Sequence, residues 1–446
     1  MKTKKRKKFA SLRNEGQRIL AQGEFVSNDT FATGSNNNDL VIGPTGAGKT
    51  RYYVKPNLLN ASESLVVTDT KGSLKEEMEP ALREAGYEVL KLDLTDPANS
   101  IGYNPFDYIE YDEASDEYNQ KDIMSFAEIL YGENHISKDP YWDEAGKALL
   151  RSLISCVLET TVREDHNTYS VRKLFELVKA EGKNGKASPY LGLMKKLEEA
   201  DPDSYAAAQY NYAMSESVEN TSNCVRMMTG NRLAYYVAKE IDELLNQKDR
   251  IDILQLAKKK TALFVTISDM DRSQDMLANL FYSQALQTLC RYADRECEDH
   301  CLPVPVRFIL DDFATNARIP DFDNHISVIR SRGIAVSIIL QSQTQLEKLY
   351  GSADATTILN GCDTVLYLGG QDLKTANYIG TRTDMTDFSI LTMPLSQAWL
   401  LQRGKKPKLV RRYELEKHPR YGLLPEAGAK KERKEVSKKA KKAFAD

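Results

Sequence analysis

The chain has 446 residues, of which 41% are hydrophobic and 28% charged, and its formal net charge is −3. This composition is typical of a soluble globular protein with enough core for two or three domains. No apolar run approaches the roughly 18 residues that a membrane span needs, and the basic start lacks the apolar segment of a signal peptide. We therefore expect a cytoplasmic chain without a transmembrane segment, whose six scattered cysteines are reduced thiols.

Both ends of the chain are basic. Residues 1–17 open with a run of lysines and arginine, and residues 426–446 are again rich in Lys. We expect both ends to be disordered, because like charges repel and little apolar surface can be buried there. Such ends either contact phosphate backbones or an anionic membrane surface, or only keep the chain soluble, and the sequence leaves both interpretations open.

The first informative motif follows two expected short strands at 19–20 and 25–26 and a polar turn at 33–38. An apolar run at 40–42, typical of a buried parallel strand, leads directly into the segment Gly43-Pro44-Thr45-Gly46-Ala47-Gly48-Lys49-Thr50. This is the G-x-x-x-x-G-K-T pattern, in which glycines let backbone N–H groups converge on phosphates. Lys49 can reach the β- and γ-phosphates, and the Thr50 hydroxyl can ligate Mg²⁺. A chance glycine turn is the alternative, but the strand before and the helix-compatible residues after favour triphosphate binding.

The next segment predicts an α/β fold. An apolar strand at 64–69 ends in Asp69, with Lys71 close behind, so both residues are expected at the strand end where α/β sheets bind ligands. A helix at about 73–85 and a strand at 87–92 follow. Strand-helix-strand alternation indicates a mostly parallel sheet covered by helices.

Residues 119–250 have a different pattern. Apolar residues recur with helical spacing at 142–154, 171–178 and 191–197, and strand signals are few. We therefore expect an all-α domain inserted between a first part of the nucleotide-binding domain, 18–118, and a second part, 251–425.

The α/β pattern returns with a strand at 261–267 and a helix at about 276–291. The strand at 305–313 ends in Asp311 and Asp312, as in a Walker B motif. We expect Asp311 to hold Mg²⁺ together with Thr50, and Asp312 to orient the attacking water. An acidic turn after a strand would be the better interpretation of this segment alone, but the earlier phosphate-binding loop favours the catalytic one.

A further buried strand at 334–340 ends in Gln341, whose amide either senses the γ-phosphate or the attacking water, or only caps a loop. Arg330 and Arg332 precede this strand. Either one could reach a neighbouring subunit's site and stabilise transition-state charge, or it could be a surface charge or a DNA contact. Strands at 364–368 and 398–401 are expected to close the sheet. The expected catalytic residues are thus Lys49, Asp311, Asp312, Gln341, Arg330 and Arg332.

Taken together, the ordered motifs resemble the type IV coupling proteins of conjugation systems, the TraG-like DNA-transfer ATPases related to the FtsK and HerA DNA pumps. The resemblance covers roughly residues 18–425 and rests on the segments 43–50, 53–57, 66–72, 103–106 (Tyr-Asn-Pro-Phe), 310–313, 319–322, 330–334, 341–342, 345–346, 350–351 and 358–364. It implies a RecA-like P-loop NTPase domain interrupted by an all-α domain, with ATP and Mg²⁺ as cofactors. It also implies a homo-hexameric ring that links relaxase-bound single-stranded DNA, the relaxosome, to the secretion channel and hydrolyses ATP to move the DNA.

Three departures from the family pattern affect this hypothesis. The usual membrane anchor is absent, so the chain would be a shorter subtype or a truncated form, or would be recruited to the cytoplasmic face of the membrane by a membrane-anchored partner. Asp312 replaces the usual Glu and shortens the reach to water by ~1.5 Å, about one C–C bond. The usual Asp-Pro-Lys-Gly reads Asp69-Thr70-Lys71-Gly72.

The departure at Asp312 keeps a second hypothesis open: a weakly hydrolysing, nucleotide-dependent scaffold that docks relaxosome or effector proteins to the channel. A cytosolic helicase or partitioning ATPase is a third and less favoured reading. DNA-stimulated turnover would separate the first hypothesis from the second.

Overall fold

The computed structural model describes residues 16–132, 140–179, 188–214, 219–235, 239–268, 274–313 and 318–428. The expectation of disorder in the basic ends falls almost entirely on 1–15 and 429–446, which lie outside the described residues. The chain forms two compact units: one comprises 1–93, 252–272 and 285–446, and the other comprises 94–251 and 273–284.

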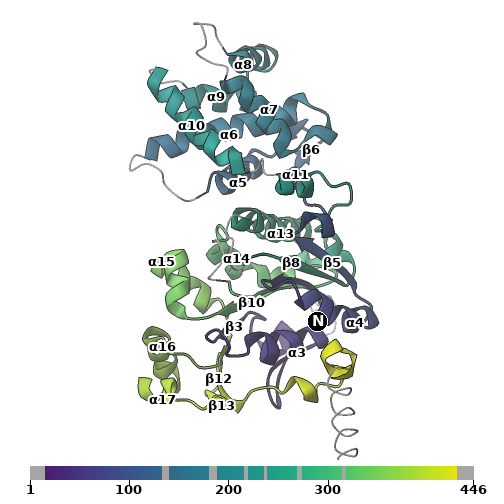
Figure 1. The fold of residues 1–446 in the computed structure, drawn as a ribbon, viewed down its shortest axis with the longest axis vertical. Coiled ribbons are helices and arrows are strands. Elements are labelled where there is room, and N and C mark those ends of the chain that lie inside the picture. Colours follow the sequence, from purple (N-terminus) through teal and green to yellow (C-terminus); the bar gives the residue numbers. More distant parts are fainter. Residues whose placement is uncertain are drawn as a thin grey trace, which may run out of the picture. The chain divides into compact units, whose positions relative to one another are not determined.

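The first unit is built on a nine-stranded sheet with the strand order β13-β12-β11-β3-β10-β9-β4-β8-β5. The seven strands β11-β3-β10-β9-β4-β8-β5 pair in parallel with their neighbours. At the other edge of the sheet, β12 pairs antiparallel with both β11 and β13. The fold predicted from the sequence, a mostly parallel α/β sheet interrupted by a helical segment, is confirmed (Figure 1). The strands are β3 Asp39–Ile42, β4 Ser64–Asp69, β5 Glu88–Asp93, β8 Thr261–Thr266, β9 Val306–Leu310, β10 Ile334–Leu340, β11 Thr364–Tyr367, β12 Gln397–Gln402 and β13 Lys408–Arg411.

Helices cover the sheet. Every residue of β3, β4, β8, β9, β10 and β11 is buried, as expected for strands with both faces covered. Val41 and Val67 belong to one core cluster with α3 and α4, whereas their buried neighbours Leu40 and Val66 do not. Side chains alternate between faces along a strand, so the second set faces the opposite side. The helices of this unit are α2 Thr30–Thr33, α3 Lys55–Leu59, α4 Leu74–Glu84, α12 Gln255–Lys258, α14 Phe322–Val328, α15 Gln343–Asn360, α16 Leu373–Thr383 and α17 Asp387–Leu391, and α13 Asp275–Glu296 continues into it from the second unit.

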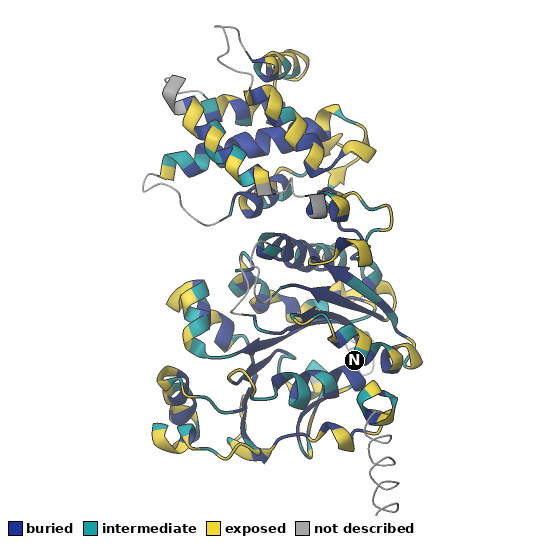
Figure 2. Cartoon of the chain, viewed as in Figure 1, coloured by how far each residue is buried: buried dark blue, intermediate teal, exposed yellow. Residues whose placement is uncertain are grey.

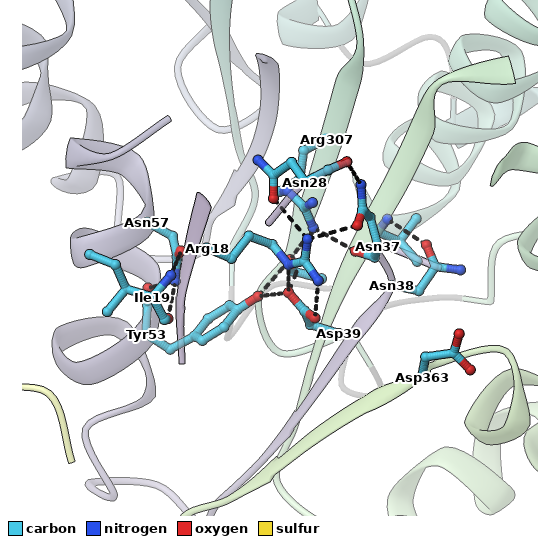
Figure 3. A network of polar contacts seen from close by, with 12 residues as sticks. Arg18, Ile19, Asn28, Asn37, Asn38, Asp39, Tyr53, Asn57, Arg307 and Asp363 are labelled. Carbon is cyan, nitrogen blue, oxygen red and sulfur yellow. Dashed lines mark hydrogen bonds and ion pairs between the residues drawn. The ribbon is translucent and has the colours of Figure 1, made fainter. Parts of the chain in front are cut away.

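A small hairpin, β1 Gln17–Ala21 and β2 Glu24–Ser27, is attached to the sheet by a buried polar network (Figure 3). Arg18 of β1 donates two hydrogen bonds to the Asp39 carboxylate, at 2.7 and 3.2 Å. The Tyr53 hydroxyl donates to the same carboxylate at 2.6 Å. Arg307 of β9 pairs with Glu63 and lies 3.7 Å from Asp39. Since Asp39 opens β3 and Tyr53 lies in the helix that follows it, this network fixes both flanks of the intervening loop.

The second unit is mainly helical in the part that the structure describes. Its elements are α5 Gln120–Tyr131, α6 Pro140–Thr160, α7 Thr168–Lys179, α8 Pro189–Ala200, α9 Tyr205–Met214, α10 Glu219–Tyr235 and α11 Lys239–Leu245, with a short hairpin of β6 Tyr111–Asp112 and β7 Glu117–Tyr118. Helix α6 is the centre of the unit, with all residues from Ala148 to Leu158 buried (Figure 2). It contacts α5, α7, α9 and α10.

This unit begins at Leu94, earlier than the boundary at residue 119 expected from helical periodicity. Residues 94–118 lack that periodicity, but their polar groups bind partners in the helical unit. Asn104 donates to the His166 carbonyl at 2.8 Å, and the Tyr103 hydroxyl bonds to Gln284. The Tyr-Asn-Pro-Phe motif therefore anchors the segment by hydrogen bonds that periodicity does not reveal.

Candidate active site

The loop after β3 needs its glycines for stereochemical reasons. Gly46 and Gly48 have φ of 81° and 82°, in the left-handed region that side chains disfavour. A Cβ atom on Gly48 would also lie 2.5 Å from the Tyr52 ring. Backbone bonds from Gly43 to the Leu340 carbonyl (3.0 Å) and from Tyr52 to the Gly48 carbonyl (2.8 Å) hold the ends of the loop. A helical segment follows at once, with a π-helical turn at Thr50–Val54 before α3.

This loop borders a cleft of roughly 560 Å³ at the carboxyl ends of β3, β4, β9 and β10. The structure brings together there most of the residues that the sequence singled out, although they come from four separate segments. The lining residues are Pro44, Thr45, Gly46, Gly48, Lys49, Thr50, Arg51, Lys55, Thr68, Asp69, Thr70, Lys71, Ser73, Leu74, Glu77, Asp311, Asp312 and Gln341. Of the expected loop, Gly43 and Ala47 do not line the cleft.

Asp311 lies at the end of β9 and faces Thr50. The Thr50 hydroxyl donates to Asp311 Oδ2 at 3.2 Å. Burial, and then the neighbouring charge of Asp312, raise the pKa of the Asp311 carboxyl to about 6. Two hard oxygen donors are therefore held side by side.

These two oxygens fit Mg²⁺. Adjacent ligands of an octahedral Mg²⁺ lie roughly 3 Å apart, given bond lengths of about 2.0–2.1 Å, which is close to the Thr50–Asp311 separation. No group of three or more His, Cys, Asp or Glu side chains suited to a metal occurs among the described residues. In nucleotide sites Mg²⁺ usually takes one or two protein ligands and completes its shell with phosphates and water.

Asp312, the residue after Asp311, contacts two further residues of the cleft. Its backbone is left-handed, with φ of 51°, a conformation that Asp tolerates better than most residues. Its carboxylate lies 3.7 Å from the Lys49 ammonium and accepts a hydrogen bond from the Gln341 amide at 3.4 Å. Lys49 also donates to the Gly43 carbonyl at 2.9 Å. Lys49, Asp312 and Gln341 therefore form a connected set in the lining of the cleft.

Asp69 and Lys71 also line the cleft, but the Asp69 carboxylate already has partners. It accepts backbone hydrogen bonds from Leu74 at 2.8 Å and from Lys71 and Lys75 at 3.3 Å, so it caps the start of α4. Burial raises its pKa, against the effect of these hydrogen bonds. A structural role is therefore visible for Asp69, and ligand binding by Asp69 and Lys71 stays a prediction.

Arg330 and Arg332 do not lie in this cleft. They occupy the short turn 329–332 before the amino end of β10, whereas the cleft lies at the carboxyl ends of the strands. Arg332 forms a bidentate ion pair with Asp294, and Arg330 donates to the Thr30 carbonyl at 3.2 Å. Within one chain they cannot act on a ligand held by Lys49.

Two basic cleft residues, Arg51 and Lys55, were not predicted from the sequence as part of the site. Arg51 and Lys55 lie one helical turn apart on the segment after the loop, and this spacing was the available signal. Lys55 pairs with Glu77, while Arg51 bonds Glu416 at 2.7 Å and Glu426 at 3.1 Å. The two ion pairs of Arg51 join this segment to the C-terminal part of the described chain, which no local pattern could indicate.

The Asp311 carboxyl predicts an unusual pH dependence of stability. Because its folded pKa is raised, the native state binds more protons than the unfolded state between about pH 4 and 6, so its contribution to stability falls as pH rises through that window. Asp311→Asn should therefore raise the melting temperature at pH 7.5, by removing a cost on the order of 1–3 kcal/mol, and the gain should shrink towards pH 4. Thermal melts at both pH values test this, and an equal loss of stability at both would contradict it.

The sheet order and the glycine-rich loop at the end of β3 define the fold as a RecA-like P-loop fold. The family whose description is type IV secretory system conjugative DNA transfer matches residues 2–411, and the chain belongs to that family. No helix in the described ranges is both long and apolar enough to cross a bilayer.

Individual relatives of the chain support the same family assignment. Protein VirD4 of Agrobacterium fabrum is 21% identical over 378 residues, which cover 84% of this chain and 53% of VirD4. The conjugal transfer protein TraG of Rhizobium radiobacter is 24% identical over 370 residues, which cover 79% of this chain and 53% of TraG. The chain thus spans about half the length of these curated relatives. The structure of the plasmid coupling protein TrwB in complex with ADP and Mg²⁺ superposes with a TM-score of 0.63 at 17% identity, covering 92% of this chain and 91% of TrwB.

Proposed function

We propose that this protein is an ATPase of a conjugative type IV secretion system that binds ATP and Mg²⁺ in the described cleft. The observation that carries this proposal is the meeting of Lys49, Thr50, Asp311 and Asp312 in one cleft of a family member. Lys49 would contact the phosphates, and Thr50 and Asp311 would hold Mg²⁺, which would neutralise phosphate charge when bound. Asp312 would accept a proton from the attacking water, with Gln341 orienting that carboxylate.

We further propose that hydrolysis drives single-stranded DNA towards the secretion channel, with relaxase or other relaxosome proteins delivering the DNA at the cytoplasmic face of the membrane. Support comes from the family match and from the VirD4 and TraG relatives. A membrane-anchored partner or the channel itself would recruit the chain. We propose that the chain assembles as a homo-hexameric ring, as its family match suggests.

In such a ring Arg330 or Arg332 would act on a neighbouring subunit, because neither reaches the cleft of its own chain. Mixing Arg330→Ala or Arg332→Ala subunits with Asp312→Asn subunits tests this assignment. Partial recovery of ATPase activity would identify an arginine that acts between subunits, since some interfaces then combine an intact site with an intact arginine. Absence of recovery would exclude that residue.

The decisive measurement is the steady-state ATPase rate with and without single-stranded DNA, for the wild type and for Lys49→Ala. We expect single-stranded DNA to stimulate the wild type and Lys49→Ala to lose activity by a factor of about 10² or more, because the ammonium that stabilises phosphate charge is gone. If the ATPase rate of the wild type is no higher than that of Lys49→Ala under every condition, the proposal of ATP-driven DNA transfer is refuted.

The second candidate function is a nucleotide-dependent scaffold with weak turnover, which docks relaxosome or effector proteins to the channel. It is favoured by the short side chain of Asp312 and by the ion pair that already engages it with Lys49. A scaffold would bind ATP while showing little stimulation by DNA, so the same measurement separates the two functions.

A further inference from the structure

Arg412, directly after β13, makes an uncommon set of contacts for an arginine. Its side chain is buried, and it donates three hydrogen bonds to backbone carbonyls: Ala47 at 2.9 Å, Leu368 at 2.5 Å and Gln397 at 3.0 Å. These carbonyls belong to the phosphate-binding loop, to the residue that follows β11 and to the first residue of β12. Across the described ranges, no carboxylate forms an ion pair with this guanidinium.

The bond to Ala47 acts on the orientation of a peptide group inside the loop. A trans peptide is planar, so its carbonyl and the N–H of the next residue point in opposite directions. With the Ala47 carbonyl held by Arg412, the Gly48 N–H points away from Arg412. Gly48 lines the cleft, whereas Ala47 does not. Arg412 therefore fixes one of the backbone donors that a phosphate-binding loop directs at its ligand.

Tyr52 contacts both Arg412 and the loop. The guanidinium carbon of Arg412 lies 5.4 Å from the centre of the Tyr52 ring, a cation–π distance. The same ring occupies the space where a Cβ atom on Gly48 would lie. The Tyr52 ring thus lies between the Arg412 guanidinium and Gly48. If the guanidinium were displaced, the ring would lose its cation–π contact and the Ala47 carbonyl its hydrogen-bond donor.

Charge gives Arg412 a second influence on the site. Burial lowers its pKa, but an arginine remains cationic at neutral pH. Because its hydrogen-bond partners are carbonyls rather than a carboxylate, its full positive charge remains beside the loop. A buried cation without a counter-charge is unfavourable by itself and favours an anion nearby.

We propose that Arg412 is a positioning residue of the phosphate-binding loop: it orients the Ala47–Gly48 peptide for phosphate binding and links the loop to the β12–β13 hairpin. This inference rests on the proposed nucleotide-binding function. The family match ends at residue 411, one residue before Arg412. The bond to Ala47 spans 365 positions of sequence, so it emerges only in the folded chain.

The test compares Arg412→Gln and Arg412→Lys with the exposed neighbour Arg411→Gln as a matched control and with Lys49→Ala as the loss-of-binding reference. The measurements are the affinity for Mg²⁺ and a non-hydrolysable ATP analogue, the kcat and KM of ATP hydrolysis, and the melting temperature without nucleotide. We expect Arg412→Gln to weaken analogue binding about tenfold, as the loss of an outer-shell partner typically does, and to raise KM more than it lowers kcat. Arg412→Lys keeps the charge but cannot reach three carbonyls at once, so its affinity for the analogue should lie between those of Arg412→Gln and the wild type. Arg411→Gln should bind the analogue as tightly as the wild type.

The outcomes separate the hypotheses. A folded Arg412→Gln that binds the analogue as tightly as wild type overturns the positioning role while leaving nucleotide binding intact. A wild type that binds no better than Lys49→Ala overturns the proposed function, and the role of Arg412 falls with it. A lower melting temperature with unchanged affinity would reveal a purely structural arginine and also refutes the proposal. If Arg412→Gln does not fold, the affinity of Arg412→Lys decides: wild-type affinity overturns the role, and weakened affinity supports it.

Discussion

Asp312→Asn is expected to lower the steady-state ATPase rate by a factor of about 10²–10⁴, the range associated with loss of a general base, while nucleotide binding persists. The amide keeps nearly the same volume and can still accept the hydrogen bond from Gln341. It cannot accept a proton from water, and it removes the charge that faces Lys49 at 3.7 Å. Rapid-quench turnover and analogue titrations of the same preparation measure the two effects separately.

Two companion variants sharpen this prediction. Asp321 also has a positive φ, of 52°, but lies outside the cleft, so Asp321→Asn controls for changing an aspartate in a left-handed backbone. Asp312→Glu adds one methylene and restores the reach that the family pattern has. A rise in turnover in Asp312→Glu would mean that reach limits hydrolysis and would favour the weakly hydrolysing scaffold. Unchanged turnover in Asp312→Asn would show that another group activates the water.

The sequence was most informative where function depends on neighbouring residues. The glycine turn after β3, the strands that end at or next to Asp69, Asp311 and Gln341, and the helical character of the inserted segment agree with the structure, because each is a local pattern of glycines, apolar runs or periodicity. Lys49, Thr50 and Asp311 were assigned to one site by chemistry alone, and the structure places them together.

The remainder required long-range information. Strand order, in which β3 lies between β10 and β11, cannot be read from period-two patterns. Helices α15 to α17 were not predicted; α15, for example, contains a residue with positive φ, Gly351, that interrupts its helical geometry. The capping role of Asp69 and the contact of Arg412 with Ala47 depend on distances in space, as does the buried network around Asp39.

That network leads to the largest expected effect on stability. Arg18, Asp39, Glu63 and Arg307 are all nearly inaccessible, with exposed fractions of 2%, 1%, 4% and 3%. Burial alone lowers the pKa of Arg307, but the charges of Glu63 and Asp39 outweigh it and raise that pKa above the ordinary value. Each charge is therefore tolerated only because its opposite is present.

Asp39→Asn should destabilise the chain by about 3–5 kcal/mol, the cost of leaving a buried charge uncompensated. Arg18 would lose its carboxylate partner, while Arg307 would keep Glu63. Tyr53→Phe, which removes one hydrogen bond to the same carboxylate but no charge, should cost only about 1–2 kcal/mol.

Replacing both charges in Arg18→Met/Asp39→Leu tests whether the penalty is electrostatic, because it should recover part of the loss when unfolding is followed in urea. Additive losses in the double variant would instead mean that shape and packing hold the hairpin. Since Asp39 and Tyr53 flank the phosphate-binding loop, we also expect Asp39→Asn to weaken nucleotide affinity at temperatures where the variant remains folded. Undiminished affinity would show that the loop keeps its form without this support.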